Sequence, residues 1–238
     1  MRFPVYKRSM GKGITMKKTF IIFNLIVLLF HGSAACAKDD LSTVLEGIKG
    51  KYGNLPGLSI AYTREVITRS MSMLGNQVKG DLAIGQMFFR PPYSLKLEQK
   101  TPNIETLVAN EETLWWYIPD KKRAHKYPSQ EFGKELRLLS DIFRGLSQVT
   151  KNFQIMMSDQ TEKGKYQIEL IPDPPWQEID RIVLTVTHAY DIRVVNIHNQ
   201  LGTITRFTLE GLTVKENFEK GFFQFIPPEG VELVEEKG

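Results

Sequence analysis

From residue 58 onward the chain consists of short runs rich in valine, isoleucine, threonine and aromatic residues, separated by turn-forming residues. Runs this short, joined by close reversals, predict antiparallel strands, because a parallel crossover needs a dozen residues or more. The pattern therefore predicts a mainly β protein built on a large meandering sheet. The predicted strands are 58–68, 79–89, 93–100, 104–109, 113–118, 122–127, 152–158, 165–171, 180–188, 191–198, 203–210 and 222–226.

Two segments depart from this pattern and have the spacing of amphipathic helices. In the first, Leu41–Tyr52, apolar residues recur on one side; we expect Asp39 to cap it and 53–57 to end it. In the second, within 131–149, leucine, isoleucine and phenylalanine recur at helical spacing, and Gly145 lowers the helix propensity near the C-terminal end of the segment. Periodicity alone leaves open whether this second helix caps a core or forms a lid over a cavity.

The excess of positive over negative charge lies in the N-terminal segment of the chain. The sequence has 31 Lys and Arg residues against 27 Asp and Glu, a net charge of +4. Residues 1–37 hold six basic residues and no acidic one, so 38–238 carries a net charge of −2. This distribution argues against a nucleic-acid partner. We expect 1–37 to be an N-terminal extension and signal peptide, and 38–238 to be one domain.

Residues 16–37 have the three parts of a secretory signal peptide. Two lysines precede a short apolar stretch, and small residues lead to a predicted cleavage site at Ala35 and Ala37. The apolar stretch is too short to span a bilayer, which takes about twenty residues. The one cysteine, Cys36, leaves two alternatives: removal with the signal from a soluble exported protein, or retention as the site of a lipid anchor.

Sequence motifs for catalysis are missing. The chain contains no G-x-S-x-G elbow, no H-E-x-x-H motif, and no Walker or G-x-G-x-x-G phosphate loop. His125, His188 and His198 do not have the spacing to cysteines or carboxylates that metal sites show. We therefore predict no catalytic residue, no metal and no cofactor. The strands instead supply aromatic and aliphatic surface, which either fills an ordinary core or encloses an acyl chain.

Seven short motifs stand in a fixed order along 40–235. They are 79–82 (KGDL), 88–91 (FFRP), 95–98 (LKLE) with Pro102, 107–110 (LVAN), 114–119 (LWWYIP), 202–204 (GTI) and 223–231 (FQFIPPEGV). In this order they resemble the motifs of the periplasmic outer-membrane lipoprotein carriers, the LolA family. One turn differs, since Asn110-Glu111-Glu112 stands where the family usually has Asp-Gly.

The resemblance implies an incomplete, half-open antiparallel β-barrel of about eleven strands, with an N-terminal helix and a lid helix. It implies a monomeric periplasmic chaperone, not an enzyme, whose hydrophobic cavity carries the acyl chains of lipoproteins from the inner to the outer membrane. An inner-membrane ABC transporter would be the donor and an outer-membrane receptor the acceptor. Two other functions stay open: a membrane-anchored acceptor or sensor of lipidated envelope proteins, which would retain Cys36, and an enzyme acting on a lipid or glycan.

The resemblance also assigns site residues. Arg90 matches the family arginine that is associated with lid closure through hydrogen bonds to backbone carbonyls of the lid. The lid would be 135–145, with Leu139, Ile142 and Phe143 facing the acyl chains.

Overall fold

The computed structural model describes residues 40–73, 80–129, 134–147, 149–158 and 164–235. Contacts divide the chain into two units, Met1–Lys38 and Asp39–Gly238, and all the described residues belong to the second. The predicted signal peptide, with its cleavage residues Ala35 and Ala37 and the neighbouring Cys36, lies outside the described residues.

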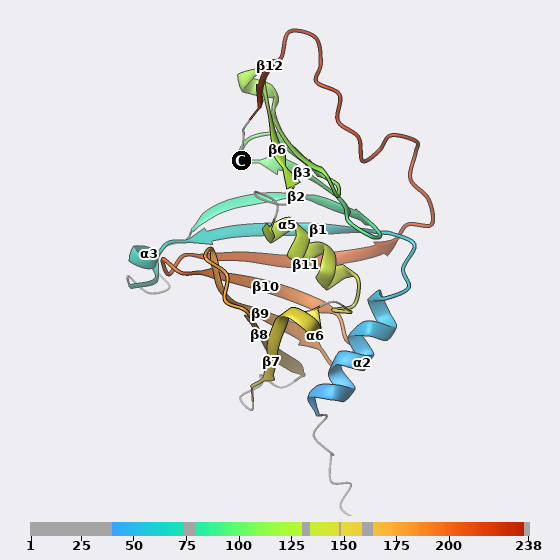
Figure 1. Ribbon diagram of the computed structural model, residues 1–238, viewed down its shortest axis with the longest axis vertical. Helices are drawn as coiled ribbons and strands as arrows, with labels where there is room; N and C mark the ends of the chain where they lie inside the picture. The colour runs from blue at the N-terminus through green and yellow to red at the C-terminus, as the bar shows by residue number, and fades with distance from the viewer. Residues whose placement is uncertain (1–39, 74–79, 130–133, 148, 159–163, 236–238) are drawn as a thin grey trace, which may run out of the picture. The chain divides into compact units, whose positions relative to one another are not determined.

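The described strands form one curled sheet of twelve strands in the order β12-β6-β5-β4-β3-β2-β1-β11-β10-β9-β8-β7 (Figure 1). All neighbouring pairs are antiparallel except β12 and β6, which are parallel. The edge strands β12 and β7 are not neighbours in this order, so the described sheet is an open barrel, which confirms the predicted fold class. The strands are β1 Leu58–Ile67, β2 Asp81–Arg90, β3 Ser94–Thr101, β4 Glu105–Ala109, β5 Thr113–Ile118, β6 Arg123–Pro128, β7 Phe153–Met157, β8 Lys165–Pro172, β9 Ile179–Thr187, β10 Ile192–Asn199, β11 Ile204–Val214 and β12 Glu232–Glu235.

Three helices lie over one face of this sheet: α2 (Leu41–Tyr52), α5 (Lys134–Phe143) and α6 (Val149–Asn152) (Figure 1). Two short elements, α3 (Arg69–Met73) and the 3-10 turn η2 (Pro119–Lys121), connect strands. We call the helix-covered face of the sheet the inner face and the opposite one the outer face.

The N-terminal cap of α2 is Asp40, whose carboxylate accepts a hydrogen bond from the Thr43 N–H at 2.8 Å. The expectation that Asp39 caps this helix is therefore wrong by one residue. The helix begins at Leu41, and the side chain that can reach the free N–H groups of the first turn is that of the residue immediately before it.

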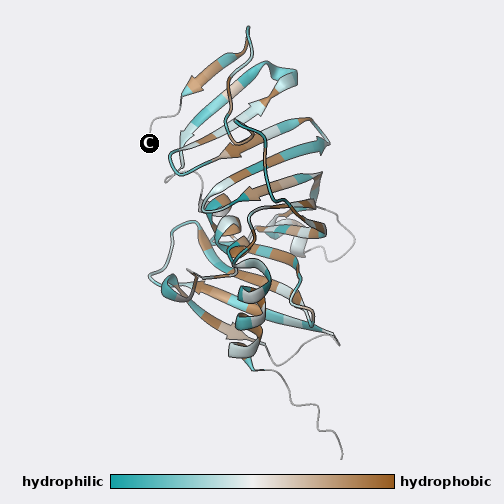
Figure 2. Cartoon of the chain, turned by 90° about the vertical axis from the view of Figure 1, so that its right-hand side faces the viewer, coloured by the Kyte–Doolittle hydropathy of each residue, from teal (hydrophilic) through white to brown (hydrophobic). Residues whose placement is uncertain are grey.

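Side chains alternate between the two faces along each strand, as the hydropathy colouring shows (Figure 2). In β8, Tyr166, Ile168 and Leu170 are buried on the inner face, whereas Gln167 and Glu169 between them are only half-buried on the outer face. The inner faces of the strands and the apolar sides of the helices form one hydrophobic core. The core therefore lies between the sheet and its helices.

One predicted strand, 222–226, is wrong. These residues form a turn followed by irregular chain, and the last strand is β12, which pairs with β6. The Phe222 ring lies 5.1 Å from the Phe88 ring of β2, and the Phe225 ring lies 5.3 Å from the Trp115 ring of β5. Phe222 and Phe225 thus pack on the outer face of the sheet. The segment 222–226 covers this face without adding a strand to the sheet.

Candidate functional site

The apolar side of α5 packs against the inner face of the sheet. Leu139, Ile142 and Phe143, which we predicted to face acyl chains, all have an exposed fraction of 0%, and Leu138 has 2%. The Phe143 ring lies 5.8 Å from the ring of Phe89 in β2. In this conformation the side chains of α5 themselves occupy the apolar inner face. Their contact with acyl chains stays a prediction.

Beyond α5 the inner face continues as an aromatic wall on β4, β5 and β6, which the sequence analysis did not identify. Leu107, Trp116, His125 and Tyr127 form it, and all four are half-buried. The Trp116 ring stacks on His125 at 5.4 Å, and the His125 ring stacks on Tyr127 at 6.0 Å. The alternation within 114–127 is the signal that would have placed these residues on one face. Movement of α5 would leave this wall and the apolar face under α5 open to a ligand.

Polar side chains of β1, β3 and β4 lie among the apolar side chains of the inner face. Arg64 Nη2 donates to Gln99 Oε1 at 3.3 Å, and Trp116 Nε1 donates to a carboxylate oxygen of Glu105 at 2.8 Å. Burial raises the pKa of Tyr62, which lies near Arg64 and Glu105, to about 12. The buried Arg64 Nε has no hydrogen-bond partner within the described part of the chain. Such a donor can bind an acceptor on the polar end of an amphiphile.

Arg90 is the last residue of β2 and its side chain is directed to the outer face. Its guanidinium lies 4.9 Å from the centre of the Phe223 ring, and its Nη2 is 3.5 Å from Ser94 Oγ. Among the described residues, no hydrogen bond joins Arg90 to a carbonyl of α5. The role of Arg90 as a lid latch stays a prediction.

The charged side of α5 contains a half-buried carboxylate, that of Asp141, whose Oδ1 atom is buried. Asp141 Oδ1 lies 3.6 Å from Arg144 Nη1, too far for a hydrogen bond, and it has no hydrogen-bond partner among the described residues. Burial raises the pKa of Asp141, and the nearby charges of Arg144 and Arg137 only partly oppose that effect. The folded protein therefore holds Asp141 in its neutral form to a higher pH than the unfolded chain does.

The segment after α5 returns close to α2. Gly145 and Leu146 both have positive φ angles, +71° and +60°. A Cβ atom on Gly145 would lie 2.8 Å from the Cα of Lys49, so only glycine fits this approach. Beside the contact is a hollow of about 290 Å³, lined partly by Ser42 and Leu45 of α2. Through this segment, the end of α5 contacts α2, the other long helix on the inner face.

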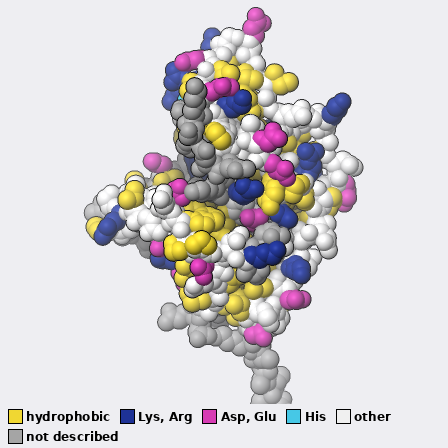
Figure 3. Space-filling view, in the orientation of Figure 1, with side chains coloured by type: hydrophobic (Ala, Val, Ile, Leu, Met, Phe, Trp, Pro, Cys, Tyr) yellow, Lys and Arg dark blue, Asp and Glu magenta, His cyan; other side chains and the backbone are white. Residues whose placement is uncertain are grey.

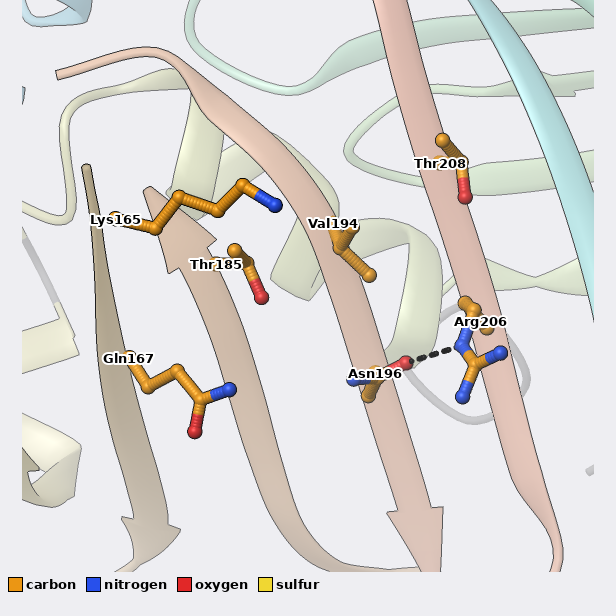
Figure 4. Close-up of a pocket in the computed structure, with 7 residues that line it drawn as sticks. All are labelled: Lys165, Gln167, Thr185, Val194, Asn196, Arg206 and Thr208. Carbon is orange, nitrogen blue, oxygen red and sulfur yellow. Dashed lines mark hydrogen bonds between the residues drawn. The ribbon is translucent and has the colours of Figure 1, made fainter. Parts of the chain in front are cut away.

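A second hollow, of about 350 Å³, lies on the outer face across β8 to β11 (Figure 4). Its lining is mostly polar, and Arg206 in it is already paired: its Nε donates to Asn196 Oδ1 at 3.0 Å, and its Nη1 lies 3.2 Å from a carboxylate oxygen of Glu65. In space-filling view, apolar side chains gather in patches between charged ones on the face shown in Figure 3. The outer hollow lacks the apolar lining that an acyl chain requires, so the inner face is the better candidate site.

The described residues show no grouping of three or more histidine, cysteine or carboxylate side chains that could hold a metal ion. Burial lowers the pKa of His198, on the outer face of β10, and the nearby Arg181 adds to this effect. Within the same residues, no helix has both the length and the apolar character needed to cross a membrane.

An open, curled antiparallel sheet that keeps its apolar face beneath helices defines the class of half-barrel proteins to which this fold belongs. The chain belongs to the family described as outer membrane lipoprotein carrier protein LolA, whose model matches residues 73–226. The carriers of this family are not enzymes, in agreement with the sequence prediction.

Individual relatives are distant in sequence. The outer-membrane lipoprotein carrier protein of Nitrosospira multiformis is 24% identical over 223 residues, which cover 93% of this chain and 99% of that protein. The protein of the same name from Methylococcus capsulatus is 26% identical over 155 residues, covering 64% and 72%. Among solved structures, an uncharacterized conserved protein of Thermus thermophilus superposes with a TM-score of 0.51 at 8% identity, covering 82% of this chain and 98% of that one, which shows a shared fold.

Proposed function

We propose that this protein binds the acyl chains of lipoproteins on its inner face and carries them across the periplasm from the inner to the outer membrane. The observation that carries this proposal is the position of α5. Leu139, Ile142 and Phe143 of this amphipathic helix fill an apolar face that extends beyond the helix into the half-buried wall around Trp116. Moving this helix would expose a largely apolar surface, with the polar groups of Arg64, Gln99 and Glu105 within it.

The free energy gained by burying an acyl chain is similar to that gained by burying the apolar side chains of α5. An acyl chain of about fifteen methylenes, at ~0.8 kcal/mol each, costs roughly 12 kcal/mol to leave in water. Four fully buried side chains of α5 contribute about 1.5–3 kcal/mol each, or about 6–12 kcal/mol together. Because α5 and an acyl chain compete for the same face with comparable free energies, the protein can accept a chain and still release it.

The direction of transfer requires an external source of energy, since the protein contains no nucleotide-binding motif. We assign that step to an inner-membrane ABC transporter as donor and the final step to an outer-membrane receptor. The predicted signal peptide, 16–37, supports export to the periplasm, and a monomer is sufficient for the transfer.

Arg90 contributes to release in this proposal, by analogy with the family arginine at the same Arg-Pro turn. A hydrogen bond from a charged donor contributes about 1.5–3 kcal/mol, which is small beside the burial of an acyl chain. Such a contact, which the described conformation does not contain, would favour the closed empty carrier and lower the net affinity for cargo.

The test uses protein purified from its own envelope. Native mass spectrometry is expected to detect a co-purified acylated protein, and a dipalmitoylated lipopeptide should bind the empty protein. If neither acylated species nor lipopeptide binding is found, the carrier function is wrong. The mass of the mature N-terminus decides between a soluble carrier that begins at Lys38 and an anchored protein that retains an acylated Cys36.

A further inference from the structure

The turn between β2 and β3 contacts α5 through Tyr93. This half-buried residue follows Pro91-Pro92, and its Oη accepts a hydrogen bond from Arg144 Nη1 at 2.8 Å. The guanidinium of Arg144 also lies 4.9 Å from the centre of the Tyr93 ring. One side chain of the turn thus makes both a hydrogen bond and a cation–π contact with the end of the lid helix.

A second arginine reaches the same ring. The guanidinium of Arg137, in the first half of α5, also lies 4.9 Å from the centre of the Tyr93 ring. Positions 137 and 144 are about 10 Å apart along a helix axis, so the two cations converge on one ring from different turns. Both contacts would be lost if α5 left the inner face. We call these three residues, Tyr93, Arg137 and Arg144, the Tyr93 clamp.

Arg90, the last residue of β2, is directed to the other face. It stands three positions before Tyr93, yet its guanidinium packs on Phe223 of the segment that covers the outer face. Asp141 Oδ1 of α5 lies 3.6 Å from Nη1 of Arg144, which directly follows the helix, so the arginine that donates to Tyr93 also has an acidic neighbour. Within the described residues, it is therefore Tyr93, and not Arg90, that makes the polar contact between this turn and the end of α5.

We propose that the Tyr93 clamp is the contact that holds the lid helix closed, and that Tyr93 is the positioning residue through which this protein sets its affinity for acyl chains. The proposal rests on the carrier function proposed above. The lid supplies the cations and the turn supplies the acceptor and the aromatic ring. Opening α5 breaks two cation–π contacts and a charged hydrogen bond together.

The test compares single variants of the full chain by hydrogen exchange of the backbone amides of α5. Tyr93→Ala removes the whole clamp, and its α5 amides should exchange about tenfold faster than those of the wild type. Arg137→Met removes one cation without changing the turn. If Tyr93→Ala does not fold, faster exchange of the α5 amides in Arg137→Met tests the clamp instead. Tyr117→Ala is the matched control, because Tyr117 packs on Phe225 at the outer face; its α5 amides should exchange at the wild-type rate.

Two results would overturn the clamp: wild-type exchange of α5 in both Tyr93→Ala and Arg137→Met, or faster exchange in Arg90→Leu alone. A second measurement uses the dipalmitoylated lipopeptide, whose affinity should rise about tenfold in Tyr93→Ala because less of the protein is closed. If wild-type protein fails to bind the lipopeptide at all, the carrier function fails, but hydrogen exchange still decides whether the clamp holds α5.

Discussion

Ile142 and Ile48 form a matched pair for testing whether α5 is a lid or an ordinary part of the core. Both are isoleucines with an exposed fraction of 0%, one on α5 and the other on α2, and both belong to the same hydrophobic core. Replacing a buried isoleucine by alanine costs about 2–5 kcal/mol. For a body of about 200 residues, that loss lowers the melting temperature by about 4–20 °C. The two variants should therefore lose similar amounts of stability.

Their effects on ligand binding should differ. If α5 must leave the inner face before an acyl chain can bind, then Ile142→Ala weakens the competitor of the ligand. A loss of about 2 kcal/mol from closure corresponds to about 30-fold in the equilibrium between closed and open protein. The affinity for a fluorescent palmitoylated lipopeptide should therefore rise at least about tenfold in Ile142→Ala. Ile48→Ala should leave it within about twofold.

The assay needs two curves for each variant, thermal unfolding by circular dichroism and a fluorescence titration with the lipopeptide. The two variants should be similar in the first curve and different in the second. Equal affinities in both variants, or weaker binding by Ile142→Ala, would show that Ile142 is a plain core residue and that α5 does not compete with the ligand.

Three further predictions concern single side chains. Because burial raises the pKa of Asp141, its protonation stabilises the folded protein: this contribution is fully present below pH 3.8 and is lost as the pH rises through the raised pKa. Asp141→Asn should remove that component from unfolding midpoints measured between pH 3 and 7, and an unchanged pH profile would contradict the assignment. Tyr52 Oη accepts a hydrogen bond from the buried N–H of Ile192 at 3.0 Å, so Tyr52→Phe should lower the free energy of unfolding in urea by about 1–3 kcal/mol, whereas a wild-type value would mean that the bond is unimportant. Arg90→Leu should bind acylated protein at least as tightly as wild type and release it poorly to outer-membrane vesicles; normal transfer would remove Arg90 from the release step.

The strands could be predicted from the sequence because most of them alternate apolar and polar residues between clear turns. The predicted and observed boundaries of β5 agree at both ends. The pattern failed at Phe222 and Phe225, since a short aromatic run has the same composition whether it forms a strand or covers a sheet. It also missed β12, a four-residue strand with a glutamate at each end, whose pairing with β6 depends on chain that returns from more than a hundred residues away.

The candidate site was only partly predictable, because local patterns place residues on a helix or strand but not against other elements. Helical spacing was enough to place Leu139, Ile142 and Phe143 on one side of a helix. It could not show which residue of the β2–β3 turn meets that helix. Arg90 and Tyr93 are three positions apart, but the β2–β3 hairpin directs them to opposite faces of the sheet. That choice depends on tertiary geometry, which local sequence patterns do not contain.

The missing pairing between β12 and β7 has a mechanical consequence. In a closed barrel, strand number and stagger fix the radius, so a larger content must break hydrogen bonds between strands. In this sheet the described strands end in two free edges, and each inter-strand ladder stays intact when the twist between neighbours changes slightly. The width of the space enclosed by the inner face of the sheet can therefore change with what fills that space. For the proposed carrier, this means that the same strands enclose a single helix when empty and several hydrocarbon tails when loaded.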